Sequence, residues 1–269
     1  MRDGMLEVFS SGGVGDSLIV GLKIQKELAR CGKGPEDVVW KHYEKHLCHV
    51  NPISDVMQHF ARQTECKIED KPEVMAQEAC GAVGGIYLDT RVPTLSYPYL
   101  DKPLRSASIK SAGSTKYLCV HLVAGRLNDN TCRKVSGQAL QTLLDNFPDK
   151  KMVLLAPTKV DVDLPLDRVV NLTGQTKTIT EAFDIINSCS LFVGQDGVLA
   201  YYAMMIQKPT IVAYHLPNLP GHYWNAKWGF HSLLFVGAGN DFNTIPDHPK
   251  VSQLFEHVRK RDEGRRLTP

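Results

Sequence analysis

Short apolar runs alternate with longer segments at helical spacing along most of this chain. Residues 6–9 predict a first strand and residues 16–30 the helix after it, because the apolar residues there recur at three- and four-residue intervals. Strands that alternate with helices form parallel sheets covered on both faces. Residues 91–115 carry three prolines and many serines without a clear period, which is typical of an interdomain crossing. We therefore predict two doubly wound α/β domains, residues 1–105 and 106–269.

The same alternation gives the remaining elements. Further strands are expected at residues 38–40, 85–88, 116–121, 152–156, 168–170, 191–193 and 210–214. Further helices are expected at residues 53–64, 73–80, 131–146, 178–189, 198–206 and 251–261. Ligands of such folds bind at the carboxyl ends of the strands, so the functional residues should lie in the turns that follow them.

The composition is that of a water-soluble globular protein, with 43% hydrophobic and 22% charged residues. The formal net charge of +2 demands neither a nucleic-acid nor a membrane partner. No transmembrane run and no signal-peptide pattern is found, so we expect a cytoplasmic protein. The seven cysteines are scattered singly, which indicates neither a disulfide framework nor a structural zinc site.

The first chemical motif is the glycine-rich turn at residues 10–17, between the first strand and the first helix. Gly12, Gly13 and Gly15 allow a sharp turn and a close approach to a ligand. A carboxylate at Asp16, at the helix start, could act as general base toward a substrate hydroxyl. Asp16 could instead be an ordinary helix cap, with the glycines serving only a tight turn. The motif is neither a Walker A sequence nor a G-x-G-x-x-G fingerprint.

The second motif spans residues 171–174 and the turn 194–197, which follows a predicted strand. Backbone donors there, with the hydroxyls of Thr173 and Thr176, could hold a diphosphate at a helix N-terminus. A Gly-x-Asp-Gly sequence is also common in ordinary turns, so this reading stays open.

Together these segments resemble glycosyltransferase family 9, the ADP-heptose:lipopolysaccharide heptosyltransferases of the GT-B fold. The turn at residues 11–16 matches the family's N-terminal turn, and residues 172–174, 178–181, 194–196 and 208–210 follow its later block. The resemblance is densest over residues 171–214.

The resemblance implies a GT-B fold with two domains facing a cleft, and an inverting sugar transfer without a bound metal or other cofactor. It places Asp16 as catalytic base. The donor diphosphate would be bound by the second domain, through Thr173, Gly174, Asp196, Gly197 and Tyr201, with Arg126, Arg133 or Lys134 on the phosphates. Cations are needed there because the leaving diphosphate gains negative charge.

Two departures from the family pattern leave alternatives open. Gly197-Val198 stands where the family has Ser/Thr-Gly, and Tyr201 where it has His. The acceptor could be a saccharide, a nucleic-acid base or a small metabolite. A rival is a non-catalytic nucleotide-binding or scaffold protein that kept the fold and lost the chemistry.

Residues 41–49 contain three histidines, a glutamate and a cysteine, and they invite a metal-site interpretation. On a helix, His42 and His46 would share one face. No further cluster of acidic or histidine partners completes such a site, so we predict a solvated polar segment.

Overall fold

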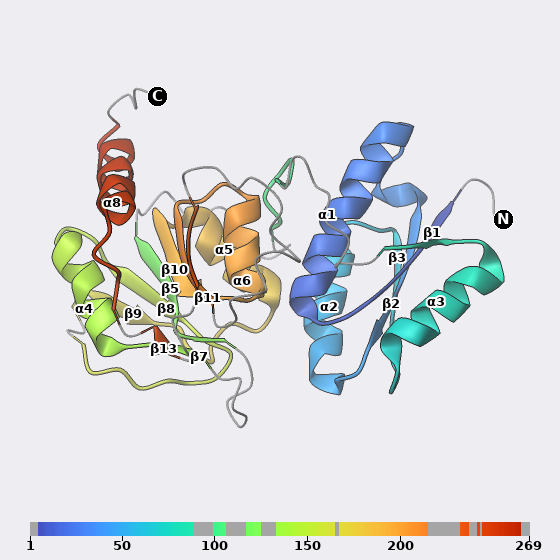
Figure 1. Ribbon diagram of the computed structural model, residues 1–269, viewed down its shortest axis with the longest axis horizontal. Coiled ribbons are helices and arrows are strands. Elements are labelled where there is room, and N and C mark those ends of the chain that lie inside the picture. Colours follow the sequence, from blue (N-terminus) through green and yellow to red (C-terminus); the bar gives the residue numbers. More distant parts are fainter. Residues whose placement is uncertain are drawn as a thin grey trace. The chain divides into compact units, whose positions relative to one another are not determined.

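The computed structural model describes residues 5–88, 99–105, 117–124, 133–164, 167–214, 232–236, 241–242 and 244–264. It divides into two compact units, chiefly Met1–Leu100 and chiefly Asp101–Lys177 with Glu181–Pro220 (Figure 1). Both are α/β, and each contains a parallel sheet. No helix in the described ranges is long and apolar enough to cross a membrane.

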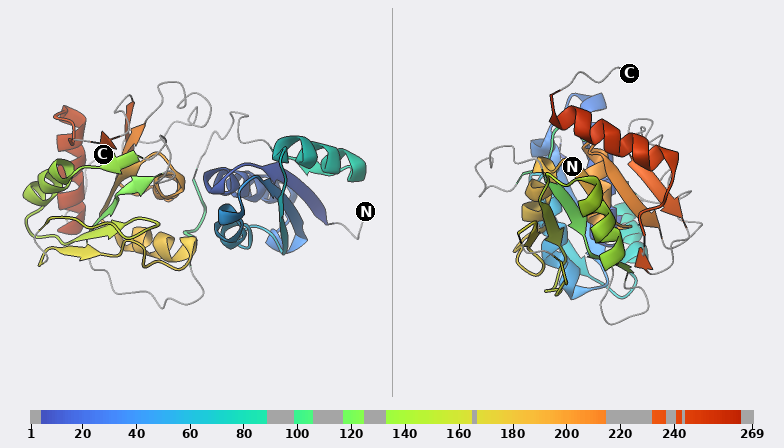
Figure 2. Two further views of the ribbon diagram at one scale, coloured as in Figure 1. Left: turned by 90° about the horizontal axis from the view of Figure 1, so that it is seen from below. Right: turned by 90° about the vertical axis from the view of Figure 1, so that its left-hand side faces the viewer.

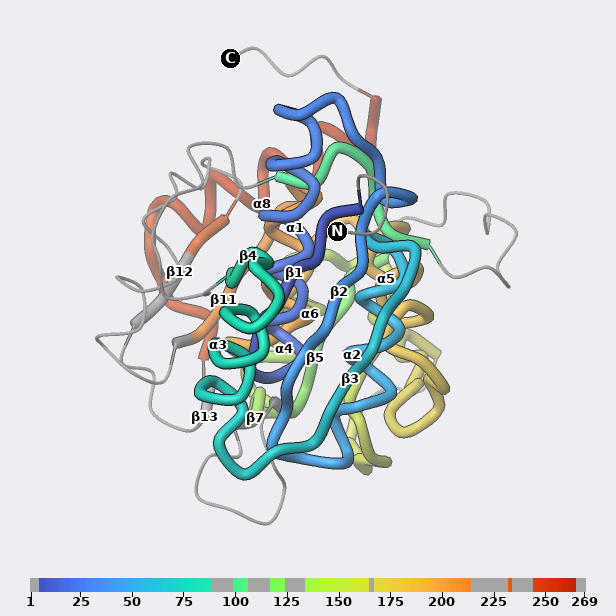
Figure 3. The backbone as a smooth tube through the Cα atoms, turned by 90° about the vertical axis from the view of Figure 1, so that its right-hand side faces the viewer, coloured from blue at the N-terminus to red at the C-terminus, as the bar shows by residue number. Residues whose placement is uncertain are grey.

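The first unit is a four-stranded parallel sheet in the order β3-β2-β1-β4. Its elements are β1 (Leu6–Ser11), α1 (Val14–Cys31), η1 (Pro35–Asp37), β2 (Val38–Glu44), η2 (Leu47–His49), α2 (Val50–Met57), β3 (Gln63–Ile68), α3 (Pro72–Val83) and β4 (Ile86–Tyr87). The chain steps from β1 outward to β3 and then returns to β4. Right-handed crossovers therefore place α1 and α2 on one face of the sheet and α3 on the other (Figure 3).

Side-chain alternation along β1 and β2 divides the buried residues between these two faces. Phe9 and Tyr43 pack against Ala76 and Cys80 of α3. Ser10 and its neighbours in alternation along β2, Trp40, His42 and Glu44, therefore face α1 and α2. All four are buried. Polar side chains thus lie on the face of the sheet that α1 and α2 cover, toward the carboxyl ends of β1 and β2.

The second unit is a six-stranded parallel sheet in the order β12-β11-β10-β5-β8-β9, with a small sheet β13-β7-β6 beside it. Its elements are β5 (Leu118–His121), β6 (Val123–Ala124), β7 (Arg133–Val135), α4 (Gly137–Asn146), β8 (Met152–Leu155), β9 (Val169–Asn171), α5 (Ile179–Ser188), β10 (Leu191–Gln195), α6 (Val198–Met205), β11 (Thr210–Tyr214), β12 (Ser232–Val236), β13 (Asp241–Phe242) and α8 (Pro249–Asp262).

Two helix pairs cover this larger sheet. α4 and α8 share one core cluster with its strands, and Phe147 and Phe255 meet there edge to face at 5.0 Å. α5 and α6 cover the other face (Figure 2). Phe183 of α5 stacks there on Tyr202 of α6 at 3.9 Å. Because helices pack on both faces of the sheet, its central strands are buried on both sides.

Two predicted helices are wrong in part. The segment 53–64 is helical only to Met57, since Phe60 N–H then donates to the Met57 carbonyl and turns the chain, and Gln63–Ile68 forms the edge strand β3. The segment 131–146 is helical only from Gly137, because Ser136 Oγ accepts the Ala139 N–H at 3.2 Å and caps the helix there.

Candidate functional site

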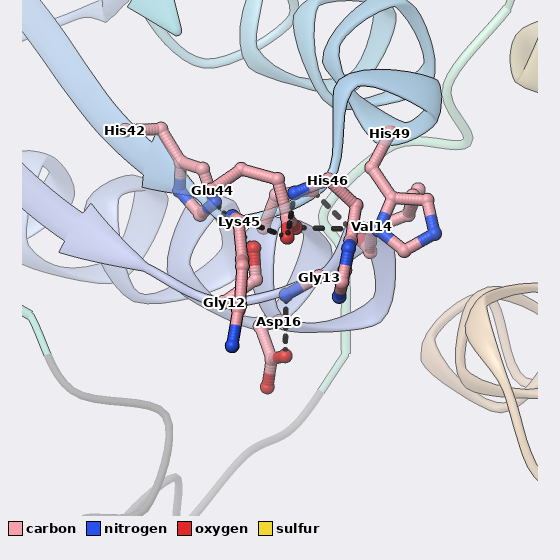
Figure 4. Close-up of polar contacts among 10 residues, drawn as sticks. Gly12, Gly13, Val14, Asp16, His42, Glu44, Lys45, His46 and His49 are labelled. Atoms are coloured by element: carbon pink, nitrogen blue, oxygen red, sulfur yellow. Dashed lines mark hydrogen bonds and ion pairs between the residues drawn. The ribbon is translucent and has the colours of Figure 1, made fainter. Parts of the chain in front are cut away.

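The glycine-rich turn joins β1 to α1 and holds Asp16 in the first turn of the helix. The Gly13 N–H donates to Asp16 Oδ2 at 2.8 Å, so the carboxylate caps the helix N-terminus (Figure 4). Gly12 has a φ of +118°, and a Cβ there would lie 2.7 Å from Asp16 Oδ2. Only glycine fits at this position. Gly15 is the second residue of α1. The turn therefore fixes the Asp16 carboxylate at the carboxyl end of β1.

A buried hydrogen-bond chain runs from the sheet to this turn. Trp40 Nε1 donates to Ser10 Oγ at 2.7 Å, and Ser10 Oγ lies 2.8 Å from His42 Nδ1. His42 Nε2 lies 2.7 Å from the carbonyl oxygen of Gly12. A carbonyl can only accept, so Nε2 carries the proton and Nδ1 accepts from the Ser10 hydroxyl. Burial lowers the pKa of His42, although the Gly12 carbonyl and Glu44 act in the opposite direction, and this favours the neutral ring.

Glu44 ends β2 and is only 4% exposed. Its Oε1 accepts the backbone N–H groups of Lys45 at 2.7 Å and His46 at 3.0 Å. Its Oε2 lies 3.3 Å from His49 Nδ1. Burial acts to raise the pKa of Glu44, but the hydrogen bonds from His49, His46 and Lys45 hold it below its ordinary value. The carboxylate is therefore ionised at neutral pH.

The predicted solvated segment at residues 41–49 is wrong for its first half. Val38–Glu44 is a strand, not a helix, and His42 is fully buried. Sequence reasoning therefore missed His42 and Glu44. The alternation of Val38, Trp40, His42 and Glu44 was the available signal. Among the residues that the structure describes, no group of three or more His, Cys, Asp or Glu side chains is placed to hold a metal ion.

In the second unit, Thr173 and Gly174 follow β9 and contact a neighbouring segment. Thr173 is 3% exposed, and its hydroxyl accepts the Val160 N–H at 2.9 Å and donates to Asn171 Oδ1 at 2.6 Å. Gly174 has a φ of +68°, and a Cβ there would lie 2.7 Å from Lys159 N. Both residues therefore hold residues 158–164 against the end of β9.

That segment forms one wall of a pocket of about 520 Å³ within the second unit. The pocket is lined by Leu122, Val123, Lys134, Val135, Gly137, Leu140 and residues 158–164. Its volume is in the range of small-molecule and cofactor sites. Lys134 is thus at the pocket. Arg133 lies in β7, where the structure describes its backbone alone, and Arg126 lies outside the described residues.

The last group of predicted site residues surrounds the start of α6. Gly197 is its N-cap, and Asp196 and Tyr201 are 5% and 8% exposed. The Tyr201 hydroxyl donates to Asp196 Oδ1 at 2.6 Å. Gln195, at the end of β10, donates through Nε2 to the Lys134 carbonyl at 2.8 Å. In the second unit Thr173 and Gly174 follow β9, Asp196 and Gly197 follow β10, and Lys134 lies in β7 and lines the pocket. Gly12, Gly13, Gly15 and Asp16 belong to the first unit.

No family model and no curated protein sequence matches this chain. Its fold is similar to that of ADP-heptose lipopolysaccharide heptosyltransferase II from E. coli, with a TM-score of 0.58 and 13% identity over 96% of this chain and 100% of that one. E. coli heptosyltransferase WaaC with ADP gives 0.53 and 10% over 94% and 100%. A glycosyl transferase family 9 protein from Veillonella parvula gives 0.50 and 11% over 88% and 87%. The predicted resemblance to family 9 heptosyltransferases is confirmed at the level of the fold.

Replacing Ser10 by alanine should destabilise the first unit. The change leaves the buried Trp40 N–H and His42 Nδ1 without the hydroxyl that joins them. We expect a loss of roughly 1 to 3 kcal/mol for each group left unsatisfied, measured by urea unfolding. Ser11→Ala is the matched control, because within the described part of the chain the Ser11 hydroxyl hydrogen-bonds to one group, the partly buried Tyr87 hydroxyl, at 3.2 Å. Equal stability of the two variants would contradict the buried chain.

Acid should destabilise the protein through His42. Burial holds the pKa of His42 in the folded protein below its ordinary value of 6.5, so the unfolded chain takes up the proton first as the pH falls through that value. This contribution to stability is present above 6.5 and is lost progressively below it. Unfolding free energies at about pH 7.5 and about pH 5.5 should therefore differ more in the wild type than in His42→Asn. An equal difference in both would remove His42 as the cause.

Proposed function

We propose that this protein is a cytoplasmic glycosyltransferase of GT-B architecture that transfers a sugar from a nucleotide-diphosphate donor to an acceptor hydroxyl. Residues 1–105 form the acceptor-side domain, and residues 106–269 bind the donor. The transfer is a single inverting displacement that uses no metal ion. The similarity in fold to heptosyltransferases, together with a carboxylate fixed at the carboxyl end of β1, carries this proposal.

Asp16 acts as general base in this reaction. Its carboxylate takes the proton of the acceptor hydroxyl while the acceptor oxygen forms a bond to the anomeric carbon. The bond from that carbon to the diphosphate oxygen breaks, and the nucleoside diphosphate leaves with the electron pair. The Gly13 N–H keeps Oδ2 in one place, so the carboxylate is positioned before the substrate binds.

The pocket beside β7 and α4 supports the donor assignment. Lys134 contributes a cation, and α4 begins at Gly137 on the pocket wall, where the positive end of its helix dipole attracts the donor phosphates. Arg133 and Arg126 are the further candidates for contacting the diphosphate. Thr173 and Gly174 serve the pocket through their hold on residues 158–164, and Asp196, Gly197 and Tyr201 complete the donor side.

The acceptor is a hydroxyl-bearing saccharide, with a nucleic-acid base or a small metabolite as alternatives. Binding to nucleic acid would weaken steeply with salt, because released counterions drive it. Salt dependence of acceptor binding therefore separates these classes.

One observation favours a second candidate function, a non-catalytic nucleotide-binding protein. The Tyr201 hydroxyl already occupies Asp196 Oδ1, at the place where the family pattern has a histidine. Binding of nucleotide sugars without breakdown or transfer of any of them would support this candidate.

Replacing Asp16 by asparagine should abolish transfer and leave donor binding nearly unchanged. Asparagine can still accept the Gly13 N–H but cannot take a proton, and loss of a general base lowers rates by typically 100- to 10,000-fold. Release of nucleoside diphosphate from a nucleotide sugar gives the rate, and calorimetry gives donor affinity. Unchanged turnover would remove Asp16 from the mechanism.

A further inference from the structure

The buried Glu44 carboxylate has a side-chain partner, His49, in addition to the two backbone N–H groups at the end of β2. Two backbone N–H groups fill Oε1, while Oε2 is directed to the imidazole of His49 (Figure 4). Burying an ionised carboxylate is costly unless several donors compensate it. Capping the backbone of Lys45 and His46 uses only one of the two oxygens. The other oxygen, Oε2, contacts His49.

The second ring nitrogen of His49, Nε2, has no hydrogen-bond partner among the residues that the structure describes. Because a carboxylate only accepts, the proton of the neutral ring belongs on Nδ1, which faces Glu44. Nε2 is then a hydrogen-bond acceptor, and no residue that the structure describes bonds to it. The His49 side chain is 32% exposed, so a ligand can reach it. The ring of His46 lies edge-on to it at 5.5 Å and supports its orientation.

This pair lies beside the proposed catalytic base. A methyl group at Gly13 would be 3.7 Å from Asp16 Oδ2 and 4.0 Å from Glu44 Oε2. The two carboxylates therefore approach the same point of the glycine-rich turn. A molecule whose hydroxyl contacts Asp16 brings its neighbouring groups toward His49.

We propose that His49 is a specificity-determining residue of the acceptor site, and that Glu44 is the residue that positions it. His49 Nε2 accepts a hydrogen bond from a second hydroxyl of the acceptor, while the first hydroxyl gives its proton to Asp16. This inference rests on the proposed glycosyl transfer. It assigns the acceptor to compounds with at least two hydroxyl groups near each other.

Glu44→Gln separates this role from a purely structural one. The glutamine Oε1 can still accept both backbone N–H groups, but its amide nitrogen replaces Oε2 and donates to His49 Nδ1. The ring proton then moves to Nε2, which can no longer accept. Nitrogen-15 NMR of the histidine rings in the intact chain should show the Nδ1–H form of His49 in the wild type and the Nε2–H form in Glu44→Gln. An Nε2–H tautomer of the neutral His49 ring in the wild type would overturn the proposal.

Acceptor preference tests the role of His49 during the transfer itself. The probes are glycerol, methanol and water, which compete for the sugar of a nucleotide-sugar donor. Since one hydrogen bond is gained, glycerol should be preferred to methanol by roughly 2- to 10-fold in the wild type, and His49→Ala and Glu44→Gln should lose this preference. The preference is the ratio of the two transfer products within each variant, so a general loss of turnover does not alter it. His46→Ala, which removes the neighbouring ring, is the matched control and should keep most of the preference.

The outcomes distinguish this inference from the function on which it rests. An unchanged preference for glycerol over methanol in both variants would overturn the role of His49. Even in that case, loss of donor hydrolysis in Asp16→Asn would support the proposed glycosyltransferase activity. No donor breakdown by the wild type with any nucleotide sugar would remove the proposed function and this inference with it.

Discussion

The geometry of the glycine-rich turn depends on hydrogen bonds buried beneath it. Trp40, Ser10 and His42 form a chain in which each donor has one acceptor, and the chain ends on the carbonyl of Gly12. Such a chain is stable only when every member is satisfied, because each lone buried polar group carries a desolvation penalty. It therefore permits one ring tautomer and one orientation of the Gly12 peptide. The positive φ of Gly12 and the contact between Gly13 and Asp16 follow from that orientation.

The second unit builds its pocket in a similar way, with internal hydrogen bonds behind a wall. Asn171 and Thr173 use their side chains on residues 158–164, so these polar residues shape the site without lining it directly. Lys134 belongs to the pocket itself, and its backbone carbonyl is held by Gln195. Both units thus place the chemical groups at the carboxyl ends of parallel strands, where the fold leaves backbone N–H groups and turn residues open to a ligand.

Much of the fold could be predicted from the sequence because the local spacing of apolar residues indicates most helices and strands. Apolar runs in the sequence predict the strands at Leu6–Ser11, Met152–Leu155 and Thr210–Tyr214. The edge strand β3 has no such run, since its residues are largely exposed, and the sequence predicts no strand there; the predicted helix 53–64 overlaps only its first two residues. Its identity comes from pairing with β2, which no local pattern records.

The residues of the candidate site also differ in how far the sequence predicts them. Asp16 and its glycines are recognisable because they are contiguous in sequence. His42 and Glu44 look like solvated residues until Ser10, Gly12 and His49 are brought to them by the pairing of β1 with β2 and by the turn after β2. Burial of a polar side chain depends on partners from other elements, so a single sequence does not contain it.

The central claim is that the folded chain binds a nucleotide-diphosphate sugar, and thermal unfolding of the full chain tests it most directly. A ligand that binds only the folded state raises the melting temperature, because it adds free energy of unfolding that grows with the logarithm of its concentration, about 2.7 kcal/mol at one hundred times its Kd. A nucleotide sugar such as ADP-heptose should raise the Tm, the nucleoside diphosphate alone should raise it too, and the free sugar should not. A Tm that no nucleotide sugar and no nucleoside diphosphate changes, at millimolar concentration, would contradict the account.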